Sequence, residues 1–153
     1  MELTNHVILA GDGPISTNAA QELESKGIDF VQIAPEPVEG AGVHRHVITG
    51  NACEESVLVD AGVRKARLVI ASHDDDGENA FISLVSKDLN PKILILAVAS
   101  SEKAIPRLKL ARADAVFAPH VLGGRLLVDL AMGKQIAQEH QDLLDSVGGL
   151  SDS

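Results

Sequence analysis

The chain contains no tryptophan or tyrosine and only three phenylalanines among its 153 residues. Proteins that bind single-stranded nucleic acid usually stack the bases on aromatic side chains. Basic residues are also in the minority, since 13 Lys and Arg against 22 Asp and Glu give a formal net charge of −9. Nucleic acids are polyanions, so this charge opposes their binding. We therefore expect no nucleic-acid partner.

Long apolar runs and paired cysteines are absent too. No segment approaches the roughly 18 apolar residues that a membrane-spanning helix requires, and the N-terminus lacks the basic stretch and apolar run of a signal peptide. Cys53 is the single cysteine, so it cannot form an internal disulfide. A reducing compartment is the simplest setting for such a chain. We expect a cytosolic domain.

Sequence motifs for catalysis are missing as well. The chain has no nucleophile elbow, zinc motif or P-loop lysine. Cys53 falls at the start of an expected helix, but Glu54 and Glu55 beside it disfavour a thiolate. A dehydrogenase generally needs a second, substrate-binding domain, and the length fits only one domain. We expect a domain that is not an enzyme.

Short apolar runs alternate with helical patterns along the chain. The runs predict strands at residues 6–10, 30–33, 47–49, 68–71, 92–98 and 115–117. Between them, apolar spacing and stop signals predict helices at residues 15–26, 53–61, 75–89 and 101–110. Such alternation is typical of an α/β protein with a parallel sheet. We predict a Rossmann-like, doubly wound sheet of six parallel strands in the order 3-2-1-4-5-6.

From Pro119 the pattern is helical, with a break expected at Gly133. We assign residues 1–134 to the Rossmann-like domain and residues 135–153 to an amphipathic C-terminal helix and tail. The apolar stripe of this extension consists of Ile136, Ala137, His140, Leu143, Leu144 and Val147. The stripe needs a surface to cover it, which is either a partner subunit or the domain itself.

A glycine-rich turn joins the first strand to the first helix, with the sequence Gly11-Asp12-Gly13-Pro14-Ile15-Ser16. It matches two glycines of the GxGxxG dinucleotide-binding pattern. Gly11 would allow the tight turn, and Gly13 would let the backbone approach a pyrophosphate at the helix N-terminus. Ser16 replaces the third glycine, which permits close packing of helix on strand, and serine is small enough to be accommodated there.

The acidic residue that would bind a ribose hydroxyl is expected about 20 residues further on, at the end of the second strand. Ala34 occupies that place, and Glu36 is the nearest substitute. The sequence therefore leaves two alternatives open. The turn binds a nucleotide such as NAD, NADH, ATP or ADP, or the glycines only shape the turn and no cofactor binds.

Asp74, Asp75 and Asp76 follow the fourth strand, at the edge where open α/β sheets bind ligands. Three adjacent carboxylates could hold Ca²⁺ or Mg²⁺. Aspartates also cap helix N-termini, and a long helix is expected to begin here. We favour capping and predict no metal site.

Several segments occur in an order that resembles the RCK/KTN domain of potassium channels and transporters, over about residues 5–135. The segments that carry the resemblance are Gly50-Asn51-Ala52, Leu58 to Val63 with Ala66, Val69-Ile70-Ala71-Ser72, Asp74 to Asp76 with Glu78-Asn79, Ala111 to Asp114, and Pro119 with Gly123 to Leu126. The chain is particularly similar to the cytosolic RCK domain that follows the pore of bacterial voltage-gated-like potassium channels.

The resemblance implies a regulatory domain that forms homodimers, and in channels rings of dimers, on the cytoplasmic side of the cell membrane beneath a transmembrane pore domain. It implies a nucleotide site made of Gly11, Gly13, Ser16, Ala34 to Glu36, Asn51, Ala52, Ser72, His73 and Asn79. The chain departs from the family pattern at Ser16, Ala34 and Asn51, and we expect these 153 residues not to include the family's usual second C-terminal subdomain.

We therefore expect a cytosolic gating domain of a potassium channel, with residues 101–110 and 122–132 at the dimer interface. A free-standing regulatory subunit of a potassium transporter is the first alternative, and a small NAD-dependent oxidoreductase is the second.

Overall fold

The apolar runs of the sequence form six strands in the computed structural model, which describes residues 3–133. All strand pairs are parallel, and the strands lie in the order β3-β2-β1-β4-β5-β6. The bounds are β1 (Val7–Ala10), β2 (Phe30–Ala34), β3 (Arg45–Thr49), β4 (Leu68–Ala71), β5 (Leu94–Val98) and β6 (Ala115–Phe117). The predicted fold class and strand order are confirmed.

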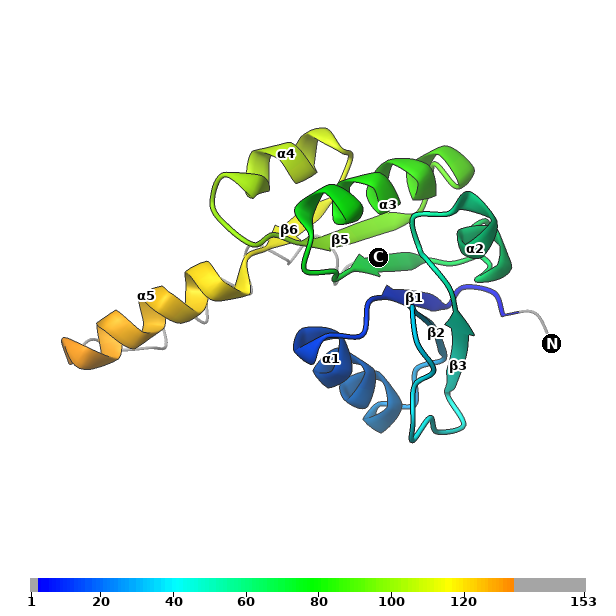
Figure 1. Ribbon diagram of the computed structural model, residues 1–153, viewed down its shortest axis with the longest axis horizontal. Coiled ribbons are helices and arrows are strands. Elements are labelled where there is room, and N and C mark those ends of the chain that lie inside the picture. The colour runs from blue at the N-terminus through cyan, green and yellow to red at the C-terminus, as the bar shows by residue number, and fades with distance from the viewer. Residues whose placement is uncertain (1–2, 134–153) are drawn as a thin grey trace.

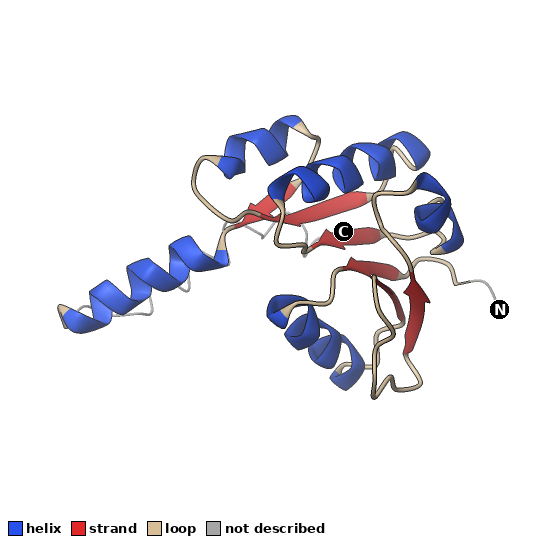
Figure 2. Ribbon diagram, in the orientation of Figure 1, coloured by secondary structure: helices blue, strands red, loops and turns tan. Residues whose placement is uncertain are grey.

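Central strands are apolar on both sides because helices cover both faces of the sheet (Figures 1 and 2). α1 (Pro14–Ser25) covers one face, and its Ala20 packs with Val7, Leu9 and Phe30. α2 (Glu55–Asp60), α3 (Asp76–Leu89) and α4 (Ala104–Leu110) lie on the other face. There they bury Leu58, Ile82 and Leu108 against strand residues such as Ile8 and Ile95.

Two helices, α4 and α2, are shorter than the sequence predicted. α4 begins at Ala104 rather than at residue 101, because the amides of Ala104 and Ile105 bond to the carbonyl groups three residues earlier. α2 is likewise shorter than residues 53–61. α1 ends as predicted, with Lys26 as its C-cap and Gly27 in the left-handed region at φ 67°.

No helix connects β2 to β3, and a loop with Pro35 and Pro37 takes its place. The Glu24 carboxylate of α1 accepts a hydrogen bond from the Gly42 amide of this loop (2.6 Å). It also forms an ion pair with Arg45 of β3 (2.9 Å). The Arg45 guanidinium lies over the Phe30 ring, 5.7 Å from its centroid. The Glu24 contacts therefore tie the loop and β3 to α1.

α5 (Pro119–Ala131) leaves the body of the domain and buries no residue (Figure 1). Val121 near its start packs against the core, but Leu127 is 70% exposed and Met132, the C-cap, is 72% exposed. Gly133 follows in a left-handed conformation (φ 74°), where the sequence predicted a break. The extension predicted for residues 135–153 lies outside the described residues. Among residues 3–133, no helix has the length and apolar character needed to cross a membrane.

Candidate functional site

The glycine turn lies between the carboxyl end of β1 and the N-terminus of α1. Gly11 is buried with φ 139°, and a Cβ atom there would lie 2.5 Å from the Ser16 Oγ atom and 2.9 Å from the Ser72 carbonyl oxygen. Only glycine fits this position. Gly13 is different, because an added Cβ atom would meet only Asp74 Oδ1, at 3.8 Å. The space beside Gly13 is therefore open to a ligand.

Ser16 lies behind this turn rather than in it. The residue is fully buried, and its hydroxyl lies 2.7 Å from the Ser72 hydroxyl. The Ser72 hydroxyl also donates to the Ala10 carbonyl group (3.0 Å). The serine that replaces the third glycine therefore has a structural role. Its hydrogen bond to Ser72 joins α1 to the end of β4 across the end of β1.

Gln32 fixes the turn from β2, a contact that the sequence analysis missed. Its side-chain Nε2 atom donates to the Gly11 carbonyl oxygen (2.8 Å), and the Gly11 amide donates to the Ile33 carbonyl oxygen (3.0 Å). Gln32 is 1% exposed in a strand that is otherwise apolar. A buried side-chain amide needs hydrogen-bond partners. A glutamine within an apolar strand was therefore the sequence feature that could have indicated this contact.

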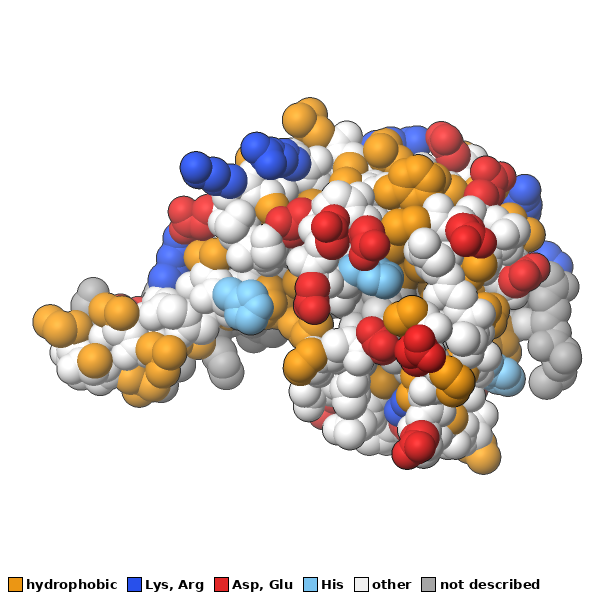
Figure 3. All heavy atoms as spheres, in the orientation of Figure 1, with side chains coloured by type: hydrophobic (Ala, Val, Ile, Leu, Met, Phe, Trp, Pro, Cys, Tyr) orange, Lys and Arg blue, Asp and Glu red, His pale blue; other side chains and the backbone are white. Residues whose placement is uncertain are grey.

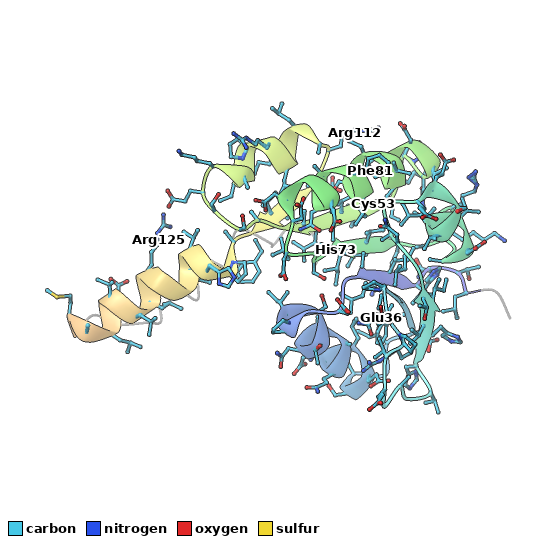
Figure 4. All side chains as sticks on the ribbon, viewed as in Figure 1. Glu36, Cys53, His73, Phe81, Arg112 and Arg125 are labelled. Atoms are coloured by element: carbon cyan, nitrogen blue, oxygen red, sulfur yellow. The ribbon has the colours of Figure 1, made fainter. Side chains whose placement is uncertain are left out.

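Asn79 of α3 shapes the loop after β4. Its side-chain amide donates to the carbonyl oxygens of His73 (2.9 Å) and Val98 (2.8 Å) and accepts from the His73 amide (2.9 Å). Asn79 is completely buried, so it positions the loop and presents no group to solvent. His73 lies between the starts of α1 and α3, with Nδ1 3.3 Å from the Glu78 carboxylate and Nε2 buried without a partner among the described residues (Figure 4).

The three aspartates have separate roles. Asp75 is the N-cap of α3 and accepts from the Glu78 amide (2.9 Å), which confirms capping for this residue. Asp76 accepts from the amide (2.8 Å) and the hydroxyl of Ser100, so it holds the turn after β5. Asp74 is exposed beside Gly13. Within residues 3–133, no group of three or more His, Cys, Asp or Glu side chains is arranged to hold a metal ion.

Two adjoining hollows open at this edge of the sheet. The smaller, of about 190 Å³, is lined by Asp12, Gly13, Ser72 to Asp75 and Glu78. The larger, of about 500 Å³, is more apolar and is lined by Pro14, Ile15, Ser72 to Asp74, Val98 to Ser100, Pro119 and His120. The structure therefore brings the glycine turn together with residues 72–75, as the resemblance implied. Residues 98–100 and His120 are additional lining residues, which only the folded sheet places here.

The remaining candidates lie on the β2–β3 side of the edge and line neither hollow. Ala34 is buried at the end of β2, and Glu36 is exposed in the following loop. Ala52 is buried, and the Asn51 side chain accepts from the Cys53 amide (2.9 Å). The structure thus places Asp12 to Ile15, Ser72 and His73 around the hollows. Gly11, Ser16 and Asn79 are buried behind them, and Ala34, Glu36, Asn51 and Ala52 lie to one side.

Negative charge dominates the surface near the turn, where carboxylates gather in Figure 3. Asp12, Asp74, Asp75 and Glu78 all line the smaller hollow. Burial raises the pKa of the Cys53 thiol, and the neighbouring Glu78 and Asp75 carboxylates raise it further. The raised pKa favours the thiol over the thiolate, as Glu54 and Glu55 beside it led us to expect.

The parallel order, the glycine turn at a helix N-terminus and the hollows at the carboxyl edge define a Rossmann-like domain of the nucleotide-binding type. Residues 7–119 match the TrkA-N domain model, and the chain belongs to this family. The RCK-type resemblance stated from the sequence is confirmed.

Several of the relatives are potassium channel proteins, and others are Trk-system potassium uptake proteins. The chain is 32% identical over 136 residues to probable potassium channel protein 2 of Methanocaldococcus jannaschii, covering 85% of this chain and 40% of that protein. It is 26% identical over 154 residues to the voltage-gated potassium channel Kch of Escherichia coli, covering 96% of this chain and 36% of that protein. The chain thus spans about two fifths of the length of these relatives.

Solved structures agree with this family. The GsuK channel bound to NAD superimposes with a TM-score of 0.66 at 26% identity, over 79% of this chain and 23% of that chain. GsuK bound to ADP superimposes with a TM-score of 0.70 at 27% identity, over 79% of this chain and 33% of that chain.

Proposed function

We propose that this chain is the cytosolic regulatory domain of a potassium channel and that it binds a nucleotide at the glycine turn. The observation that carries the proposal is the open approach to Gly13 at the N-terminus of α1, beside the hollow formed with residues 72–75. Free amide groups and the helix dipole favour a phosphate there. Structures of a related channel with NAD and with ADP support the choice of ligand class.

The proposal assigns the domain a regulatory role and no catalytic step. The Ser16 and Ser72 hydroxyls are bonded to each other and to backbone carbonyl groups, and the Cys53 pKa is raised. The Glu78 and Asp75 carboxylates near Cys53 favour its protonated form, which is a poor nucleophile. A bound ligand would therefore act only by stabilising one arrangement of the assembly over another.

The assembly that we propose is a homodimer, built into a ring beneath the pore domain. α4 and α5 supply its interface, because α5 exposes Leu127, Val128 and Leu130, its C-cap Met132 is exposed too, and α4 exposes Leu110. Apolar side chains exposed together along one helix indicate a protein contact. An ion pair between Glu102, just before α4, and Arg125 of α5 links the two segments at the surface.

Calorimetric titration with NAD, NADH, ATP and ADP tests the nucleotide site. Gly13→Ala places a methyl group where the ligand would contact the protein backbone. In the unliganded fold this methyl group has space, because its nearest neighbour would be Asp74 Oδ1 at 3.8 Å. We expect this variant to lose affinity by about tenfold, equal to about 1.4 kcal/mol. Gly123→Ala is the matched control, because a Cβ atom there has nothing within 4 Å. No binding of any of the four nucleotides to the unmodified chain would reject the ligand assignment.

A further inference from the structure

A second cavity lies at the opposite edge of the sheet, where β4 and β5 begin. Its volume is about 650 Å³, and its walls come from Asn5, the segment 64–67, Asn90, Lys92 and Leu94. The glycine turn faces the other ends of these strands, after Ala71 and Val98. This amino-edge cavity is therefore separate from the proposed nucleotide site.

The walls of the amino-edge cavity are held in place by hydrogen bonds. The Asn90 side-chain amide donates to the carbonyl oxygens of Val63 (3.0 Å) and Ala66 (3.2 Å), which ties the α3–β5 turn to the segment before β4. The Asn5 amide donates to the Lys65 carbonyl oxygen (2.7 Å), and the Leu94 amide donates to the Arg67 carbonyl oxygen (3.1 Å). The shape of the cavity is thus set before any ligand arrives.

Its charge is opposite to that of the chain as a whole. Four cationic residues line the cavity, Arg64, Lys65, Arg67 and Lys92, and no Asp or Glu of the described residues does. Arg64, Arg67 and Lys92 take part in none of the ion pairs found among residues 3–133. Elsewhere, Lys26, Arg45, Lys87, Arg112 and Arg125 each have a carboxylate partner, whereas Lys103, Arg107 and Lys109 beside and on α4 also take part in none of these ion pairs but do not line the cavity.

Like charges held together repel one another, and a bound anion relieves that repulsion. Arginine presents a planar fork of N–H donors that matches phosphate oxygens. The volume lies within the range of about 300–1,000 Å³ typical of small-ligand sites.

We propose that the amino-edge cavity binds a ligand carrying a multivalent phosphate group, held by Arg64, Arg67 and Lys92. Two sources share this chemistry, a soluble phosphate ester and the phosphate headgroup of an anionic lipid. The proposal does not depend on a nucleotide binding at the glycine turn.

Inorganic tripolyphosphate is the probe, titrated into the full chain by calorimetry. Arg67→Gln with Lys92→Gln removes two cavity cations, and both side chains are exposed, so the fold should persist. We expect about a tenfold or greater loss of affinity, because charge-assisted hydrogen bonds to phosphate are lost. Arg107→Gln with Lys109→Gln is the matched control, since it removes the same charge from exposed positions of α4, and it should retain the affinity.

A second pair of measurements separates the ligand sources and the two sites. Co-sedimentation with phosphatidylglycerol vesicles, compared with phosphatidylcholine vesicles, reports headgroup binding, which the Arg67/Lys92 variant should lose. If only tripolyphosphate binds, the ligand is a soluble phosphate. In the Gly13→Ala background, the Arg67 and Lys92 substitutions should still lower tripolyphosphate affinity and the α4 control should not, so failure of the nucleotide site does not remove this prediction. Equal losses in the cavity variant and the α4 control, or no binding of either probe, would overturn the proposal.

Discussion

At the scale of single residues, the two glycines of the turn have different requirements. Gly11 needs a positive φ and has no room for a Cβ atom, whereas Gly13 has ordinary backbone angles and open space. Gly11 is thus required by the fold and Gly13 by the proposed ligand. Sequence pattern alone assigns both glycines to the same motif and does not make this distinction.

Gly11→Ala should therefore destabilise the domain by about 2–4 kcal/mol, because it adds backbone strain and a clash with the Ser72 carbonyl group. Gly13→Ala should change stability by less than about 0.5 kcal/mol. Urea denaturation followed by circular dichroism measures both values. Equal stability of the two variants would contradict the geometry of the turn.

Asp12 is an exposed carboxylate at the place where a phosphate would bind. Asp12→Asn removes a like charge and should tighten ADP binding by about two- to fivefold at low salt. Asp60→Asn, an equal charge change at the end of α2, should have no such effect. Calorimetry at low and high ionic strength measures the difference, which should shrink as salt is added. Unchanged affinity in Asp12→Asn would place the phosphate elsewhere.

At the scale of elements, most of the sheet followed from the sequence because buried parallel strands are continuous apolar runs. β3 is the exception, since it begins at Arg45 and His46 and only its apolar end, Val47–Thr49, was predicted. Arg45 is accepted in the strand because Glu24 of α1 pairs with it. That pairing depends on the three-dimensional packing of α1, which local pattern does not encode.

In the candidate site, too, local sequence predicted some features and three-dimensional packing determined others. The glycine turn and the aspartates were found because their neighbours in sequence define them. The Gln32–Gly11, Ser16–Ser72 and Asn79–Val98 contacts join segments that are far apart in the chain. They depend on which strand lies beside which, so they became visible only in the assembled sheet.

The Glu24 contacts predict a pH dependence of stability. The hydrogen bond from the Gly42 amide lowers the pKa of the Glu24 carboxyl group below its ordinary value, and Arg45 lowers it further. The folded state thus holds this proton more weakly than the unfolded state. The stabilisation is present above the ordinary carboxyl pKa and is lost as the pH falls through the lowered pKa.

Glu24→Gln should therefore be less stable than the unmodified chain at pH 7, and the difference should shrink on acidification below about pH 4. Thermal unfolding across this pH range is the measurement. Glu22→Gln, on an exposed part of the same helix, serves as the control. A difference that stays constant down to the lowest pH would contradict the role assigned to the carboxylate.

At the scale of the whole molecule, α5 is the feature that a monomer does not explain. Leu127→Glu with Val128→Glu should shift a dimer toward monomer, because it places charge in the apolar contact that we propose. Val43→Glu is the control, since Val43 is 89% exposed in a loop and should not affect assembly. Analytical ultracentrifugation measures the mass. A monomeric unmodified chain at high concentration would argue against the interface.

The central claim is that a nucleotide binds at the carboxyl edge of the sheet, against the glycine turn. Amide chemical shifts of the ¹⁵N-labelled chain, recorded during titration with ADP, test it most directly. The account predicts concentrated shifts at Asp12, Gly13 and Ile15 and at Ser72 to Asp75. Shifts confined to residues 64–67 at the amino edge, or none anywhere in the chain, would contradict it.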